Sequence, residues 1–171
     1  SAFSQFSTEA CDFTATGWFG ENAEWTYGYI DWTFQGYYKM ELSGDTMLQG
    51  LPCKKVQRRR TGVSFLFPGV KTTIFDDRYV YEAFDKVSVW NGNGFTVLYD
   101  FNLQPGDTLT FAAVNCPERQ YVIDSVGITE IDGVELRYQK ARMFPGWPFT
   151  EIEEITIIER LGEVYRKQNG S

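Results

Sequence analysis

The sequence contains no histidine among its 171 residues. Histidine is the commonest general base and a frequent zinc ligand, so its absence excludes the Ser-His-Asp and Cys-His arrangements and most zinc sites. The chain also lacks the GxSxG and P-loop motifs, and it has no GxGxxG following a strand. We therefore expect no catalytic residues of these kinds, no metal site and no cofactor.

Positive charge is also scarce. The chain has 16 Lys and Arg against 23 Asp and Glu, which gives a net charge of -7 and a pI near 4.7. Nucleic-acid binding needs clustered cations that displace counterions, so we expect no nucleic-acid partner. No apolar stretch approaches the roughly 20 residues needed to span a bilayer, so we expect no membrane insertion.

One basic cluster lies between residues 54 and 60. Because side chains alternate along a strand, its cations should divide between two faces. Such a division favours protection of a sheet edge or pairing with nearby carboxylates over a nucleic-acid groove. The cluster contains Lys54, Lys55, Arg58, Arg59 and Arg60.

Cysteine is limited to Cys11, Cys53 and Cys116, which are far apart and form no CxxC motif. This spacing argues against a metal site and against a thioredoxin-type motif. In an oxidising compartment two of the three can pair, and spacing alone does not rank the three pairings. The alternative is that all three are simply buried.

Aromatic residues, by contrast, make up 17% of the chain, and Thr and Val are frequent. Period-two alternation with turn residues about every ten positions predicts an antiparallel all-β fold in one domain, residues 1–171. The expected meander closes either as a barrel or as a two-layer β-sandwich, and alternation does not decide between them. The predicted strands are residues 24–30, 33–42, 53–60, 63–67, 71–76, 78–84, 86–90, 95–101, 108–113, 120–130, 134–142 and 152–160.

Three turns between these strands can be predicted in detail. Pro105 and Gly106 predict a type II turn over residues 104–107, with Asp107 accepting backbone N–H bonds. The Gly44-Asp45 pair predicts a second corner of the same kind. Around Asp132-Gly133, a three-residue loop is expected, because a two-residue loop would place Glu130 opposite Glu135. The three-residue loop aligns Ile128 with Leu136 and leaves Gln139 on the wetter face of the sheet.

Four segments together carry a family resemblance. They are "YKMELSGDTMLQGLPCKKVQR" at residues 38–58, "KVSVWNGNGFTVLYDFNLQPGDTLTF" from Lys86, "VIDSVGITEIDGVELRYQKAR" from Val122 and "IIERLG" from Ile157. In this order they resemble an uncharacterised secreted β domain of Bacteroidetes, which commonly precedes a C-terminal sorting domain for type IX secretion. The resemblance implies export to the medium or the cell surface, and it supplies no catalytic residues.

The aromatic residues are the main candidates for ligand binding. Rings exposed in a row can stack on the apolar face of a sugar, as in a carbohydrate-binding module. The candidate rings are Trp18, Trp25, Trp32 and Trp147. The alternative is that they fill the core, with Trp147 the best exception because it lies in a proline-rich loop.

Carboxylates offer a third possibility, a glycosidase that uses two of them, with one kept protonated by its surroundings. Acidic residues that alternate along strand edges are more often a solvated face. The candidates are Asp76, Asp77, Glu82, Glu151, Glu153 and Glu154. We therefore expect a non-catalytic accessory or binding module of a secreted or cell-surface protein, with a polysaccharide or a cell-surface protein as its partner.

Overall fold

The computed structural model describes residues 23–30, 33–66, 68–112, 118–144 and 152–165. These segments form two antiparallel sheets. The first contains β1 (Glu24–Ile30), β2 (Phe34–Leu48), β3 (Leu51–Ser64), β4 (Val70–Ala83), β5 (Lys86–Trp90) and β6 (Phe95–Asp100). The second contains β7 (Thr108–Phe111), β8 (Arg119–Ile131), β9 (Val134–Phe144), β10 (Glu153–Ile158) and β11 (Gly162–Tyr165). Across these segments, no helix is long and apolar enough to cross a membrane.

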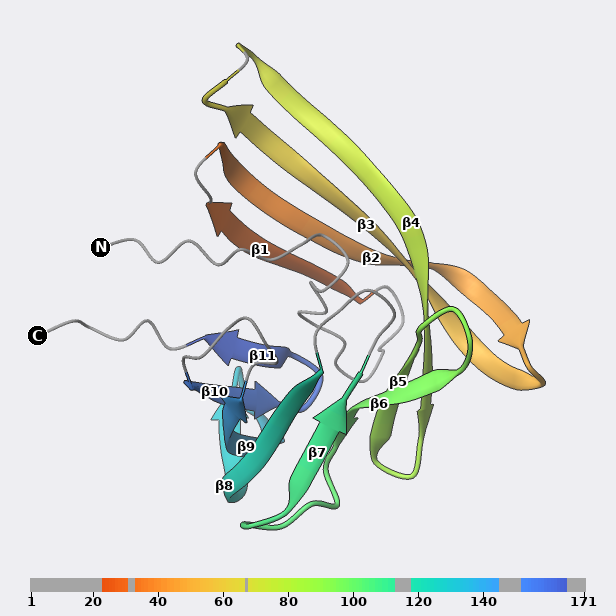
Figure 1. Ribbon diagram of the computed structural model, residues 1–171, viewed down its shortest axis with the longest axis vertical. Helices are drawn as coiled ribbons and strands as arrows, with labels where there is room; N and C mark the ends of the chain where they lie inside the picture. Colours follow the sequence, from red (N-terminus) through yellow and green to blue (C-terminus); the bar gives the residue numbers. More distant parts are fainter. Residues whose placement is uncertain (1–22, 31–32, 67, 113–117, 145–151, 166–171) are drawn as a thin grey trace, which may run out of the picture.

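Each sheet is a simple meander in which strands that follow one another in sequence lie side by side. The order is β1 to β6 in the first sheet and β11 to β7 in the second, so the chain changes sheet only between β6 and β7. Figure 1 shows that both sheets are curled, with the first extending far above the second. The predicted all-β antiparallel meander is confirmed, and it takes the form of two curled sheets.

Several strands are longer than predicted, and in β2 and β4 bulges absorb residues that the sequence suggested were breaks. β2 continues through Gly44-Asp45, where its register with β3 shifts between Leu42 and Gly44. A β-bulge inserts one extra residue without ending the ladder, so the predicted corner at this position is wrong. β4 likewise joins 71–76 and 78–84, because its register with β3 shifts between Phe75 and Arg78. β3 joins the predicted strands 53–60 and 63–67 with a continuous register through Thr61 and Gly62. β11 was not predicted.

The hairpin between β8 and β9 also differs from prediction. Ile131 pairs with Val134, so the loop has two residues, and Glu130 lies opposite Glu135. Asp132 has φ 52° and Gly133 has φ 77°, the two positive values that a type I′ turn requires. Both glutamates are exposed, where water screens their repulsion, so the favourable turn decides the register.

The turn over residues 104–107 is confirmed. The Asp107 N–H donates to the Gln104 carbonyl at 3.0 Å, and Gly106 has φ 96°. The Asp107 carboxylate accepts from the Gln104 N–H at 2.8 Å. Asp107 therefore shapes this turn, as the sequence predicted.

The core lies between the two sheets, and both contribute to it. Val87, Val89 and Leu98 come from the first sheet, and Phe111 and Ile123 from the second. Side chains from both sheets thus lose contact with water together, which is the main stabilising contribution in such a fold.

Cys53 is also buried, with a free thiol that donates to the Leu51 carbonyl at 3.4 Å. Burial raises the pKa of this thiol, so it stays protonated at neutral pH. Cys11 and Cys116 lie outside the described residues, so the predictions about them stay predictions.

Candidate functional site

Trp25 is the one predicted binding tryptophan that lies in the described part of the chain, and it is buried in the core. Its indole N–H donates to the Arg160 carbonyl at 3.2 Å, and the Tyr27 hydroxyl donates to the Leu161 carbonyl at 3.2 Å. β1 is thereby attached to the loop between β10 and β11. The prediction of an exposed ring at Trp25 is wrong, because the ring is 7% exposed.

The other three candidates, Trp18, Trp32 and Trp147, lie outside the described residues. Their use in ligand binding stays a prediction.

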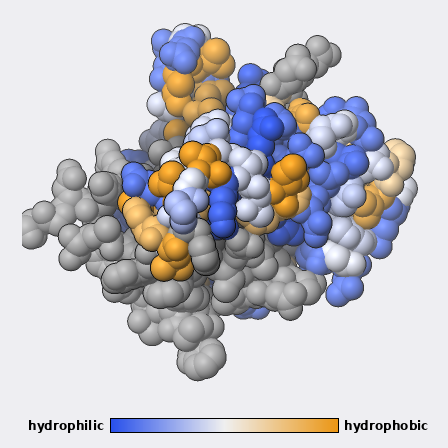
Figure 2. All heavy atoms as spheres, turned by 90° about the horizontal axis from the view of Figure 1, so that it is seen from above, coloured by the Kyte–Doolittle hydropathy of each residue, from blue (hydrophilic) through white to orange (hydrophobic). Residues whose placement is uncertain are grey.

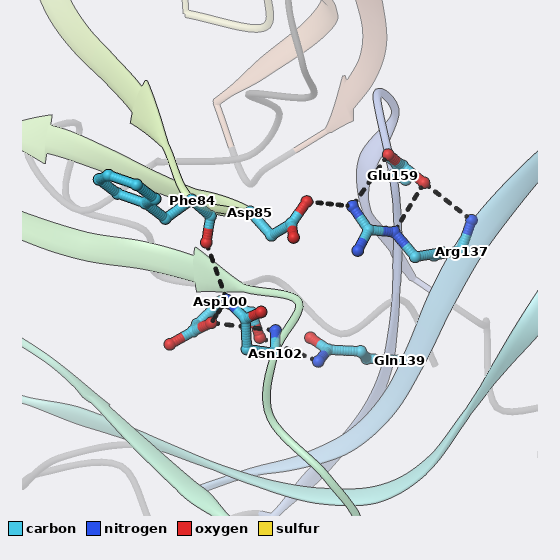
Figure 3. A network of polar contacts seen from close by, with 7 residues as sticks. All are labelled: Phe84, Asp85, Asp100, Asn102, Arg137, Gln139 and Glu159. Carbon is cyan, nitrogen blue, oxygen red and sulfur yellow. Dashed lines mark hydrogen bonds and ion pairs between the residues drawn. The ribbon is translucent and has the colours of Figure 1, made fainter.

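A network of polar side chains joins elements of the two sheets (Figure 3). At the end of β6, the buried Asp100 carboxylate accepts from the backbone and side-chain N–H groups of Asn102, both at 3.0 Å. Lys86 forms an ion pair with its other oxygen at 2.8 Å. From β9, the buried Gln139 amide donates to the Asp100 carbonyl at 3.0 Å. These bonds fix the corner where the chain leaves the first sheet.

Arg137 on β9 is the second centre of the network. Its guanidinium contacts Glu159 through two N–H groups, at 3.1 and 3.2 Å, and Asp85, in the turn between β4 and β5, at 2.7 Å. The Arg137 backbone N–H also donates to Glu159, at 3.1 Å. Its guanidinium carbon lies 5.5 Å from the centre of the Phe101 ring. The side chain therefore joins β9 to one hairpin loop of each sheet.

The network favours the ionised form of Asp100 and Glu159. Burial of Asp100 opposes ionisation, but Lys86 and Asn102 outweigh burial and hold the pKa of this carboxyl below its usual value. Burial also opposes ionisation of Glu159, but the hydrogen bonds and charge of Arg137 outweigh burial and lower the pKa of Glu159. A glycosidase acid needs a raised pKa, so neither group is suited to donate a proton at neutral pH.

This network makes the protein sensitive to acid. The lowered pKa values of Asp100 and Glu159 mean that their stabilising effect is complete above the ordinary carboxyl pKa of about 4 and is lost as the pH falls through the folded-state values. Urea unfolding of the wild type should show a clear loss of stability between about pH 7 and about pH 3. A variant with Asp100→Asn and Glu159→Gln should lose less over the same interval, and an equal loss in both proteins would contradict the assignment.

The strand-edge carboxylates proposed for hydrolysis are spread over the sheets. Asp77 forms an ion pair with Lys55 at 3.1 Å, and Asp76 and Glu154 are exposed. Glu82 and Glu153 are partly buried on β4 and β10, and Glu151 lies outside the described residues. No group of three Asp, Glu or Cys side chains able to hold a metal occurs among the residues that the structure describes.

The basic cluster divides between two faces, as predicted. Lys54 and Lys55 form ion pairs with Asp45 and Asp77, and Arg59 forms one with Glu41. Arg58 and Arg60 lie on the opposite face to Arg59, over aromatic rings. The Arg60 guanidinium lies 4.6 Å from the centre of the Phe34 ring, and that of Arg58 lies 5.3 Å from the centre of the Phe75 ring.

The far end of the first sheet carries exposed apolar side chains, which we call the distal patch. Residues opposite each other on antiparallel strands share a face. The strand register pairs Ile30 with Gln35, Gln35 with Val63 and Val63 with Val70, so these residues form one row across β1 to β4, on the face turned away from the core. The distal patch consists of Ile30 (57% exposed), Val63 (42%), Phe65 (60%), Leu66 (66%), Val70 (70%) and Ile74 (68%). Figure 2, seen from above, shows hydrophobic side chains among hydrophilic ones on this side of the molecule.

Sequence reasoning missed both the distal patch and the polar network. Alternation indicates which residues share a face, but the patch follows from which faces the second sheet leaves uncovered. Comparisons of the chain with family models, curated proteins and solved structures found no match.

Proposed function

We propose that this chain is a non-catalytic module of a secreted or cell-surface protein and that it binds a protein partner through the distal patch. The observation that carries the proposal is the set of six apolar side chains exposed together at one end of the first sheet. Exposed apolar side chains gathered at one end of a sheet commonly mark a protein interaction site. The export and accessory role rests on the resemblance of the sequence motifs.

Charges near the distal patch support a binding role for the apolar residues. On the same face, Lys39 forms ion pairs with Glu24 at 2.7 Å and with Glu41 at 3.4 Å, and Arg59 contacts Glu41 at 3.0 Å. These charges form the polar border next to the patch. An apolar centre with a polar rim is the usual anatomy of a protein interface.

Site-specific photo-crosslinking tests the proposal. A photoreactive phenylalanine derivative at Leu66, in the exported protein of its native host, should yield a discrete crosslinked partner. The same derivative at Phe84 is a matched control, because Phe84 is 89% exposed and lies at the other end of β4. Identical products at both positions, or none at Leu66, would contradict the proposal.

A binding measurement with the identified partner completes this test. Leu66→Ser should weaken its affinity by about tenfold or more, since a central apolar side chain contributes strongly to binding. Phe84→Ser should leave the affinity unchanged. Binding in a glycan array, with no crosslinked protein, would instead favour the carbohydrate-binding alternative.

A further inference from the structure

The first half of β4 is an uncovered sheet edge. β3 pairs with β4 from Val70 to Val80, but β5 pairs only with the segment from Val80 to Ala83. In Figure 1, β4 forms the outer border of the upper part of the sheet. Within the described residues, the strand before Val80 therefore has a neighbour on one side only. Residues 70–74 are all exposed.

The sequence of this edge favours pairing with another strand. It reads "VKTTIF" from Val70 to Phe75, with four β-branched residues, one charge and neither proline nor glycine. It is also free of bulges, because the nearest register shift lies beyond Phe75. Natural edges are usually protected by prolines, bulges or several charges, and an edge without them is a template for strand addition.

We propose that this edge pairs antiparallel with the same edge of a second copy of the chain, so that two six-stranded sheets become one. The argument for a second copy is that the segment is complementary to itself. A two-fold axis through Thr72, perpendicular to the sheet, sets Thr72 opposite its own equivalent. Val70 then lies opposite Ile74 of the second copy, twice by symmetry.

This register matches the chemistry on both faces of the sheet. Val70, Thr72 and Ile74 share the outer face, so the two pairs of Val70 with Ile74 cover apolar side chains that are 70% and 68% exposed in one copy. On the other face, Lys71 lies opposite Thr73 of the second copy, and not opposite another lysine. A register centred on Lys71 would set two like charges together, which is unfavourable.

The pairing also connects with the distal patch, because Val70 and Ile74 belong to it. In the joined sheet, Ile30 and Val63 of both copies lie on one continuous outer face. The inference does not depend on the partner of the proposed function. If the chain proved to be a monomer, the proposed pairing of β4 edges would be wrong. The crosslinking test at Leu66 would still decide whether the distal patch binds a protein partner.

Charge substitutions at Thr72 test the pairing, because this residue meets its own equivalent. Thr72→Lys alone and Thr72→Glu alone should each weaken self-association about tenfold in sedimentation equilibrium under reducing conditions, since like charges then face each other. An equimolar mixture of the two variants should recover the dimer, because the charges are opposite. Recovery also shows that both variants are folded.

Thr61 supplies the matched control. Its hydroxyl bonds that of Thr72 at 2.9 Å, so Thr61→Lys removes the same hydrogen bond, but Thr61 lies on β3, one strand away from the edge. Thr61→Lys should dimerise like the wild type. A wild type that sediments as a monomer, a Thr72→Lys variant that dimerises normally, or a mixture that stays monomeric would each overturn the proposal.

Discussion

Replacement of Trp25 by alanine is expected to lower the free energy of unfolding by about 3–5 kcal/mol, as for other buried tryptophans. The ring belongs to the core, and its N–H holds the loop between β10 and β11. Domains of this size have a total stability of about 5–15 kcal/mol, so the loss is a large fraction of it. Urea unfolding followed by circular dichroism measures the change.

Two variants separate the contributions at Trp25. Trp25→Phe keeps a ring in the core and removes the donor to Arg160, so it should cost about 1–2 kcal/mol. Ile128→Ala is a control on an exposed apolar side chain, 66% exposed, and should stay within about 0.5 kcal/mol of the wild type. If Trp25→Ala cost no more than Ile128→Ala, the position of Trp25 in the core would be contradicted.

Features of the fold set by local chemistry could be predicted from the sequence. Pro105 and Gly106 restrict their own backbone angles, so the turn that ends at Asp107 needs no distant partner. The same holds for Asn91, whose side chain accepts from the N–H groups of Asn93 and Gly94, both at 3.0 Å. Strand type was likewise predicted by alternation, because the core selects one face of each strand.

Features that depend on bulges could not be predicted in the same way. The register between β8 and β9 shifts between Ile123 and Ser125, where Asp124 forms an ion pair with Arg142. The extra residue lies on β8, so it reverses which face the later side chains of β8 occupy and leaves the alternation of β9 unchanged. Gln139 was expected on the wetter face because a three-residue loop was expected between the two strands, and it is buried against the corner at Asp100.

The polar network and the contacts of Trp25 join residues that are far apart in sequence. Trp25 and Arg160 are separated by 135 positions, and Arg137 and Asp85 by 52. Alternation carries no information on how two sheets face each other. The acidic and basic residues of the network could therefore be identified as charged strand residues, but their partners could not.

Gly36→Ala is expected to destabilise the far end of the first sheet by about 3 kcal/mol, the upper part of the usual range for overpacking. Gly36 lies directly opposite Gly62 on the inner face. A Cβ at Gly36 would lie 2.6 Å from the Gly62 Cα and 2.9 Å from the Phe34 ring, and it would also collide with the Thr61 carbonyl oxygen. Two of these neighbours are backbone atoms, so the strands themselves must move.

Gly28→Ala is the control for this prediction. A Cβ at Gly28 would meet no atom within 4 Å, so the change should be neutral or stabilise by a few tenths of a kcal/mol, because alanine loses less entropy on folding. Urea unfolding compares the two variants, and amide hydrogen exchange locates the effect. In Gly36→Ala, exchange should accelerate first in β2 and β3 near the distal patch, while the polar network around Arg137 keeps its protection. Equal stability of the two variants would show that the close contact between Gly36 and Gly62 does not hold these strands together.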